Sequence, residues 1–337
     1  MWYKTKKTTY LIIILIIALF TSYGIHYTLQ SGDATNSTVT MIDGAGRYLS
    51  ITLPVKQIVS LASSVSEILC SIDACDTLCA VDQYSTFPPN LREKLETVDG
   101  FNVGSGATPS IEKIIYHSPD IVFVWPYCSV IDEIENQGIA VYIIQYPDNI
   151  FDIIELIKTV GIITGKEYRA EEISSFLTGY VNLVENRTKE SDHHPSVYFE
   201  LGEPGKTGND STISGSLIKI AGGLNIAGNN SLQYLTINNE YIISSNPDII
   251  IKFYYGTEPD EEEMNNLKDE MMNRPGWSAI NAVKNNRIHI IHYSECSTNP
   301  RIAIGLIRYA KWINPELFQD LDEIELAEYI YTYIYEL

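Results

Sequence analysis

The side chains best placed to bind a ligand follow a series of short apolar runs that are typical of β-strands. In an open parallel sheet, ligands bind beyond the carboxyl ends of the strands, so these positions should share one edge. The first half of the chain places there Ser63, Ser64, Asp82, Tyr84, Trp125 and Tyr127. The second half places there Glu200, Glu203, Tyr254, Tyr255, Tyr293 and Arg301. Aromatic rings and hydroxyl groups in two facing lobes would suit a large, partly planar or chelate-like ligand.

From these positions we expect ligand contacts at Ser63, Ser64, Tyr84, Trp125, Tyr127, Glu200, Tyr254, Tyr255 and Arg301. Each tyrosine has an equally good explanation as a packing residue of the core or surface. Arg301 follows Asn299 and Pro300 and could pair with an anionic group of the ligand. The alternative for Arg301 is a structural salt bridge at the start of a helix.

Sequence signatures of catalysis and of metal binding are missing from the chain. It contains no G-x-S-x-G elbow, no Walker loop and no H-E-x-x-H motif. The adjacent His193 and His194 lie in a polar stretch, and the glycines of segments 44–49 and 220–228 lack the strand-then-helix context of a nucleotide site. We therefore expect no catalytic residue, no metal site and no covalently bound cofactor.

Short β-rich runs alternate with helical stretches, which is the pattern of parallel α/β sheets. The pattern occurs twice, because SPDIVFV begins at Ser118 and the similar NPDIIIKF begins at Asn246. Between the halves, apolar residues from Ile173 to Val184 follow the spacing of one helical face. The sequence predicts an α/β protein of two Rossmann-like lobes with parallel sheets, joined by a single long interdomain helix. The expected bounds are 39–150 for the first lobe, 151–190 for the connecting helix and 191–337 for the second lobe with its terminal helices.

Length and charge exclude several classes of protein. With 337 residues the chain is too long for a small disulfide scaffold, and 45% apolar and 20% charged residues are typical of a globular protein. The formal net charge of −20 would repel the phosphates of nucleic acid, which we exclude as a partner.

The N-terminus has the pattern of an export signal. Lys4, Lys6 and Lys7 precede an apolar run at 10–20, and a softer extension reaches Leu29. We expect residues 1–30 to be a signal peptide or an N-terminal membrane anchor and residues 31–38 to be a linker. Since no cysteine follows the run closely, an uncleaved anchor is preferred to a lipid-modified cysteine, with cleavage left open. The positive-inside rule then places the body outside the cytoplasmic membrane, at its outer face or released from it.

Two further sets of residues bear on export. Sequons for N-glycosylation at Asn36, Asn186, Asn209 and Asn229 are compatible with it. The five cysteines, Cys70, Cys75, Cys79, Cys128 and Cys296, lack the spacing of a metal site. We expect buried thiols, with a Cys75 to Cys79 disulfide as the alternative.

From residue 39 to 318 the chain resembles the helical-backbone family of ABC-transporter substrate-binding proteins. The resemblance is carried by QIVSLASSVSEIL, VDQYSTFPP, IEKIIYHSPDIVFV, IKIAGGLNIAG, NPDIIIKFYY, GWSAINAVKNNRIHII and NPRIAIGLIRYAKWINPELF, in this order. It implies two α/β lobes joined by one long helix, with the cargo held in a shallow cleft between the lobes. It also implies an iron complex, either a siderophore or haem, or a corrinoid as cargo, and as partners a permease and, through it, a cytoplasmic ATPase. It does not choose among these cargoes.

The resemblance also implies a docking glutamate on each lobe, facing arginines of the permease. The first corresponds to Glu67, while the position expected for the second holds Ser216 and Leu217, so Glu200, Glu203 or Asp210 would have to replace it. Two alternatives to transport stay open. One is an extracytoplasmic metallochaperone or enzyme on the same scaffold, in which His289, His292 and a carboxylate would converge. The other is a membrane-tethered sensor.

Overall fold

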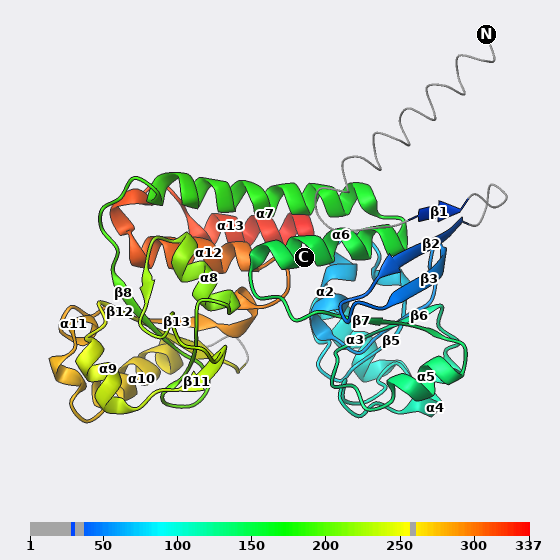
Figure 1. Ribbon diagram of the computed structural model, residues 1–337, viewed down its shortest axis with the longest axis horizontal. Coiled ribbons are helices and arrows are strands. Elements are labelled where there is room, and N and C mark those ends of the chain that lie inside the picture. Colours follow the sequence, from blue (N-terminus) through cyan, green and yellow to red (C-terminus); the bar gives the residue numbers. More distant parts are fainter. Residues whose placement is uncertain (1–27, 31–36, 257–260) are drawn as a thin grey trace, which may run out of the picture. The chain divides into compact units, whose positions relative to one another are not determined.

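The computed structural model describes residues 28–30, 37–256 and 261–337, and these form two compact units (Figure 1). The first unit comprises residues up to Ser66, Asp76–Tyr146 and Ile163–Gly165, and the second comprises Glu67–Cys75, Pro147–Ile162 and Lys166–Leu337. Most of the expected export signal and linker lies outside the described residues. Within the described part, no helix is both long enough and apolar enough to cross a membrane. The expected lobe bounds of 39–150, 151–190 and 191–337 stay a prediction.

The first unit is built around a four-stranded parallel sheet of order β5-β4-β6-β7. Its strands are β4 (Ile58–Ser60), β5 (Leu78–Val81), β6 (Ile121–Val124) and β7 (Ala140–Ile143). The connections contain α2 (Ser63–Ser71), η2 (Cys75–Thr77), α3 (Pro89–Thr97), α4 (Ile111–Tyr116) and α5 (Ile131–Asn136). Nearly every residue of these strands is buried, which explains their continuous apolar runs. An antiparallel sheet of β1 (Thr28–Gln30), β2 (Ser37–Ile42) and β3 (Tyr48–Leu53) completes the unit.

The second unit repeats this plan with a parallel sheet of order β10-β8-β12-β13. Its strands are β8 (Ser196–Glu200), β10 (Leu224–Asn225), β12 (Ile249–Tyr254) and β13 (Ile288–His292). A small antiparallel pair, β9 (Lys206–Gly208) with β11 (Tyr234–Thr236), stands beside it. The expected α/β class with a parallel sheet in each half is confirmed.

Helices cover both faces of the second sheet (Figure 1). On one side α7 (Glu167–Thr188), α8 (Ile213–Ile220), α12 (Ile302–Ile313) and α13 (Glu323–Tyr329) pack against one another. On the other side α10 (Glu261–Met272) contacts β13 and α11 (Asn281–Lys284) contacts β12. The remaining helical segments are α9 (Asn239–Ser245), the turns η3 (Trp277–Ala279), η4 (Tyr293–Cys296) and η5 (Pro315–Leu317), and the π-helical turn η6 (Ile330–Ile334).

The long helix predicted between the halves is α7, and its predicted apolar face is buried at Ile173, Leu177, Val181 and Val184. The region 151–190 is, however, not one helix. It begins with a separate helix, α6 (Ile150–Thr164), and the two are divided at Gly165. Gly165 adopts φ 68°, a left-handed conformation that ends α6 and that glycine adopts without steric cost.

The repeated Pro-Asp motif has the same structural role in both units. Asp120 precedes β6, and its Oδ2 accepts hydrogen bonds from the backbone N–H groups of Lys56 and Gln57, just before β4. Asp248 precedes β12, and its Oδ2 accepts from the N–H and the hydroxyl of Ser196, at the start of β8. Each aspartate thus fixes the start of the neighbouring strand, which supports the interpretation of two related halves.

The cysteine prediction needs a correction. Cys70 and Cys75 form a disulfide, so the expected thiol at Cys70 and the alternative Cys75 to Cys79 bridge are both wrong. After α2 the chain reverses through Asp73, whose φ of 58° is left-handed, and this turn returns Cys75 to the end of the helix. Cys128 and Cys296 are buried thiols as expected, and the half-buried Cys79 thiol donates to the carbonyl of Ile58.

Two glycines in helices give opposite expectations for a substitution to alanine. A Cβ at Gly305 in α12 would lie 1.9 Å from the carbonyl oxygen of Glu295, whereas a Cβ at Gly179 in α7 would meet nothing within 4 Å. Gly305→Ala should therefore lower the free energy of unfolding by about 1–3 kcal/mol, because the backbone has to shift. Gly179→Ala should raise it by about 0.5–1 kcal/mol. Urea denaturation of both variants measures the difference, and similar effects would contradict the packing of α12 against η4.

Candidate functional site

Three aromatic rings gather at the carboxyl edge of the first sheet. Trp125, directly after β6, stacks on Tyr146 with ring centres 4.9 Å apart and planes 9° from parallel. Tyr127 lies beside the same ring of Tyr146, at 6.3 Å. Tyr127 and Tyr146 are about half exposed and Trp125 is half-buried, so the group, here called the aromatic platform, presents ring surface to solvent. Of its members, the sequence identified Trp125 and Tyr127 and missed Tyr146, which follows β7.

A buried carboxylate lies next to the platform. Asp82, directly after β5, is 4% exposed, and its Oδ1 accepts a 2.6 Å hydrogen bond from the Ser85 hydroxyl. The Ser85 and Ser66 hydroxyls are in turn 2.8 Å apart. Burial raises the pKa of Asp82 to about 6, against the opposing effect of hydrogen bonds from the Ser85 hydroxyl and from the backbone of Tyr84 and Ser85. Burial, together with the neighbouring Tyr146 and Asp82, also raises the pKa of Tyr127.

The remaining first-unit candidates lie on the loops around this carboxylate. Tyr84 is 60% exposed. It lies in the turn that is closed by a hydrogen bond from the Ser85 N–H to the Asp82 carbonyl. Ser63 and Ser64 begin α2 and are half-buried. The Ser64 hydroxyl oxygen is buried and has no hydrogen-bond partner among the described residues.

In the second unit a tyrosine pair lies at the carboxyl edge of the sheet. Tyr255, just after β12, stacks on Tyr293, just after β13, with ring centres 5.4 Å apart and planes 14° from parallel. Both are about half exposed, and burial of the remainder raises the pKa of Tyr255 to about 12. Tyr254 faces another way, since its hydroxyl donates to Glu263. The structure therefore brings Tyr255 together with Tyr293 and not with Tyr254.

Glu200 is not placed to contact a ligand. It is fully buried, and its two oxygens form ion pairs with Lys252 at 2.9 Å and with both terminal nitrogens of Arg274 at 2.7 and 2.9 Å. Burial alone would raise the pKa of Glu200, but the bonds from Arg274 and Gly205 and the charge of Lys252 lower it. The expectation of ligand contact is corrected: Glu200 is the centre of a structural ion-pair network.

Arg301 and Glu67, expected in two separate roles, form one buried ion pair. Arg301 Nε and Nη2 donate to the two oxygens of Glu67 at 2.8 and 2.7 Å, and Tyr335 donates to Glu67 Oε1 at 2.6 Å. Glu67 is 4% and Arg301 8% exposed. This is the structural salt bridge that stood as the alternative for Arg301. A docking glutamate needs an exposed carboxylate, so we do not retain that role for Glu67.

The histidines proposed for a metal site have other neighbours. His289 stacks on Trp312 at 4.6 Å. The two ring nitrogens of His292 lie within hydrogen-bonding distance of the Ser294 hydroxyl and the Gly256 carbonyl. Across the described ranges no group of three histidine, cysteine or acidic side chains could hold a metal ion.

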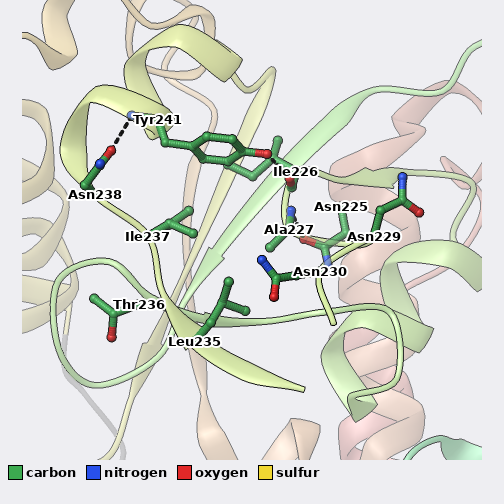
Figure 2. Close-up of a pocket in the computed structure, with 10 residues that line it drawn as sticks. All are labelled: Asn225, Ile226, Ala227, Asn229, Asn230, Leu235, Thr236, Ile237, Asn238 and Tyr241. Carbon is green, nitrogen blue, oxygen red and sulfur yellow. Dashed lines mark hydrogen bonds between the residues drawn. The ribbon is translucent and has the colours of Figure 1, made fainter. Parts of the chain in front are cut away.

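The second unit also contains a pocket that the sequence did not indicate. It has a volume of about 490 Å³ and lies between the segment that follows β10 and the stretch from β11 into α9 (Figure 2). It is lined by Asn225, Ile226, Ala227, Asn229, Asn230, Leu235, Thr236, Ile237, Asn238 and Tyr241. The Tyr241 hydroxyl donates to the Ile226 carbonyl and Asn238 caps α9, so part of the polar lining shapes the pocket.

The sequence and the fold of this chain are similar to those of several known proteins. The sequence profile of a family described as periplasmic binding protein matches residues 58–294. The uncharacterized ABC transporter substrate-binding lipoprotein YvrC of Bacillus subtilis is 24% identical over 294 residues, which are 84% of this chain and 87% of that protein. A cobalamin-binding protein of Halobacterium salinarum is 25% identical over 226 residues, 65% of this chain and 59% of that protein.

Among solved structures, the molybdate periplasmic binding protein MolA of Haemophilus influenzae is similar in fold. It superposes with a TM-score of 0.74 at 19% identity, and the match covers 88% of this chain and 98% of that one.

The raised pKa of Asp82 predicts a pH-dependent stability. Because the folded state raises this pKa from 3.8 to about 6, the carboxyl group favours folding below pH 4 and loses that contribution as the pH rises through 6. The change corresponds to about 3 kcal/mol. Asp82→Asn does not titrate, so its unfolding free energy relative to the parent protein should rise by about that amount between pH 4 and pH 8. A pH-independent difference in urea denaturation would contradict the assignment.

The Glu67 and Arg301 pair predicts strongly coupled substitutions. Arg301→Met should lower the free energy of unfolding by about 3–5 kcal/mol, because it leaves a buried carboxylate without its cation. Adding Glu67→Gln should recover part of that loss, since it removes the uncompensated charge. A double-mutant cycle by urea denaturation measures the coupling. Two strictly additive losses would show that the groups do not form a pair in solution.

Proposed function

This chain belongs to the periplasmic binding protein family, and from that premise we propose that it is the extracytoplasmic substrate-binding component of an ABC importer. The observation that carries the proposal is the family match across both parallel sheets, together with exposed aromatic groups at the carboxyl edge of each. The relatives named for ABC transport and for cobalamin binding support it. They do not favour the alternative of a metallochaperone or an enzyme.

The proposed cargo is a metal chelate, namely an iron complex with a siderophore or haem, or a corrinoid. Flat conjugated ligands stack on aromatic side chains, and the aromatic platform and the pair of Tyr255 and Tyr293 offer such surfaces. The exposed Tyr84 adds a hydrogen-bonding group in the first unit. The ligand is held without covalent chemistry and passed to a permease driven by a cytoplasmic ATPase.

Docking to the permease is proposed to use exposed acidic groups. In the second unit Glu203 and Asp210 are exposed, unlike Glu200, and are the candidates for contact with basic residues of the permease. The N-terminal segment is proposed to tether the body to the outer face of the cytoplasmic membrane. YvrC is named a lipoprotein, whereas this chain has no cysteine between its apolar run and Cys70, so an uncleaved helix is the proposed tether.

Replacing Trp125 tests the proposed ligand face. Trp125→Ala should weaken binding of the cargo by more than tenfold, about 1.4 kcal/mol, because it removes the stacking surface and the support of Tyr146. Tyr116→Ala is the matched control: Tyr116 is 80% exposed, and α4, which it ends, leads to the amino end of β6. Isothermal titration calorimetry with ferric siderophores, haemin and cobalamin measures the dissociation constants of both variants. Equal dissociation constants for the two variants would remove the platform from the binding site.

A further inference from the structure

We propose that the cargo is a neutral or cationic chelate with uncharged hydrogen-bonding groups, such as a corrinoid with amide side chains or a ferric trihydroxamate, and not a polyanionic chelate. The inference rests on the proposed function, because it names the class of cargo for the same surfaces. The inference is drawn from the positions of the basic side chains in this chain.

The loops at the carboxyl edge of the first sheet contain no basic residue. They comprise segments 61–66, 82–88, 102–110, 125–130 and 144–146, none of which holds a lysine, arginine or histidine. Segment 102–110 belongs to this edge, since a Cβ at Gly106 would lie 2.3 Å from the Leu61 carbonyl and 3.5 Å from Asp82 Oδ2. The one charged residue in the set is Asp82. Lys113 of α4 reaches these loops from outside, since its Nζ donates to the Asn102 carbonyl at 2.9 Å. A carboxylate or catecholate group brought here would meet this single exposed cation and would be repelled by Asp82.

Basic side chains near the strand ends of the second sheet already have partners. Arg308 pairs with Glu295, just after β13, and His292 lies within hydrogen-bonding distance of Ser294 and Gly256. Lys252 and Arg274 pair with Glu200, and Arg301 pairs with Glu67. Their side chains are only 7%, 13% and 9% exposed. Lys252 also donates to the carbonyls of Leu201 and Gly202. Using Arg301 for a ligand anion would leave the buried Glu67 carboxylate without its cation, at a cost of several kcal/mol, and using Lys252 or Arg274 would remove one of the two cations of Glu200.

The pocket of the second unit is uncharged as well. Its ten lining residues comprise four asparagines, a threonine, a tyrosine, three branched aliphatic residues and an alanine (Figure 2). The side chains of Asn225, Asn230 and Asn238 also bond to the backbone, and their remaining N–H groups can donate to amide or hydroxyl oxygens of a neutral ligand. The volume of about 490 Å³ lies within the range of small-molecule pockets, about 300–1,000 Å³. It would accept a side arm of a chelate more readily than a charged group.

One exposed cation lies close to this pocket. Lys206 begins β9 and stands opposite Thr236 of the pocket lining in the antiparallel pair. A single lysine at the surface is a flexible, strongly hydrated point charge and cannot offset several ligand charges. Substitution of Lys206 therefore tests the inference most directly.

The test is a titration of the full chain in detergent against four chelates of different charge. Cyanocobalamin and a ferric trihydroxamate represent the neutral or cationic class, and haemin and a ferric tricatecholate represent the anionic class. We expect the best ligand of the first class to bind at least tenfold more tightly than either anion. If that ligand is neutral, its dissociation constant should change by less than twofold between 50 and 500 mM salt, since no charge pair is screened, whereas binding of a cationic ligand should weaken as salt rises.

Tighter binding of haemin or of the tricatecholate would overturn the inference and leave the proposed function standing. Absence of binding to all four chelates, with native folding shown by circular dichroism, would overturn both.

Two variants test the charge argument itself. Gln83→Arg places a cation on the exposed loop beside Asp82 and should tighten haemin binding at least threefold, whereas the isosteric control Gln83→Met should not. Lys206→Gln should leave binding of the neutral chelate within twofold. Loss of that binding in Lys206→Gln, or no effect of Gln83→Arg on haemin, would contradict the proposal.

Discussion

The buried ion pair between Glu67 and Arg301 links parts of the second unit that are far apart in the sequence. It joins the middle of α2 to the start of α12, 234 positions away, and Tyr335 adds the end of the chain. Arg301 also donates to the Ser294 hydroxyl, which lies 2.6 Å from Nδ1 of His292 at the end of β13. The pair therefore fixes the turn that carries Tyr293 against Tyr255. Since burying two charges is costly unless they are fully paired, this arrangement leaves little freedom for either group to serve a ligand.

The cost of burying a charge without a partner also explains the ion pairs of Glu200. It determines which side chains remain for ligand binding. Lys252 and Arg274 stabilise its carboxylate inside the second unit, so the charges near that sheet are used to hold the fold. The exposed groups at the strand ends include the aromatic rings of Tyr255 and Tyr293, and the nearby pocket is lined by amides. In a chain of net charge −20, such surfaces favour recognition by stacking and by uncharged hydrogen bonds over attraction of anions.

The sequence predicted the features that depend on local patterns. Continuous apolar runs located the buried strands, the spacing of Ile173 to Val184 located α7, and the two Pro-Asp motifs identified the repeated halves. It also placed Trp125 and Tyr127 correctly at a strand end. These results depend on short-range periodicity and on the rule that parallel strands end at one edge.

The sequence could not predict the contacts that depend on tertiary structure. Nothing local distinguishes a glutamate at an exposed helix position from Glu67, whose partners lie 234 and 268 positions away. Glu200 was misassigned for the same reason, since Arg274 comes from a distant turn. Tyr146 was missed because it follows its strand by three residues, and the Cys70 partner of Cys75 depends on a left-handed turn at Asp73. None of the ten residues that line the pocket is charged, so no charged motif marked it in the sequence.

The central claim is that the chain delivers a chelate to an importer, and uptake by cells measures it most directly. A strain lacking the gene for this chain is compared with the same strain carrying it, using radiolabelled cobalamin, ferric siderophores and haem. The account predicts that uptake of one chelate falls to background in the deletion strain and returns when the chain is restored. Unchanged uptake of every chelate, although the restored protein is present and folded, would contradict it.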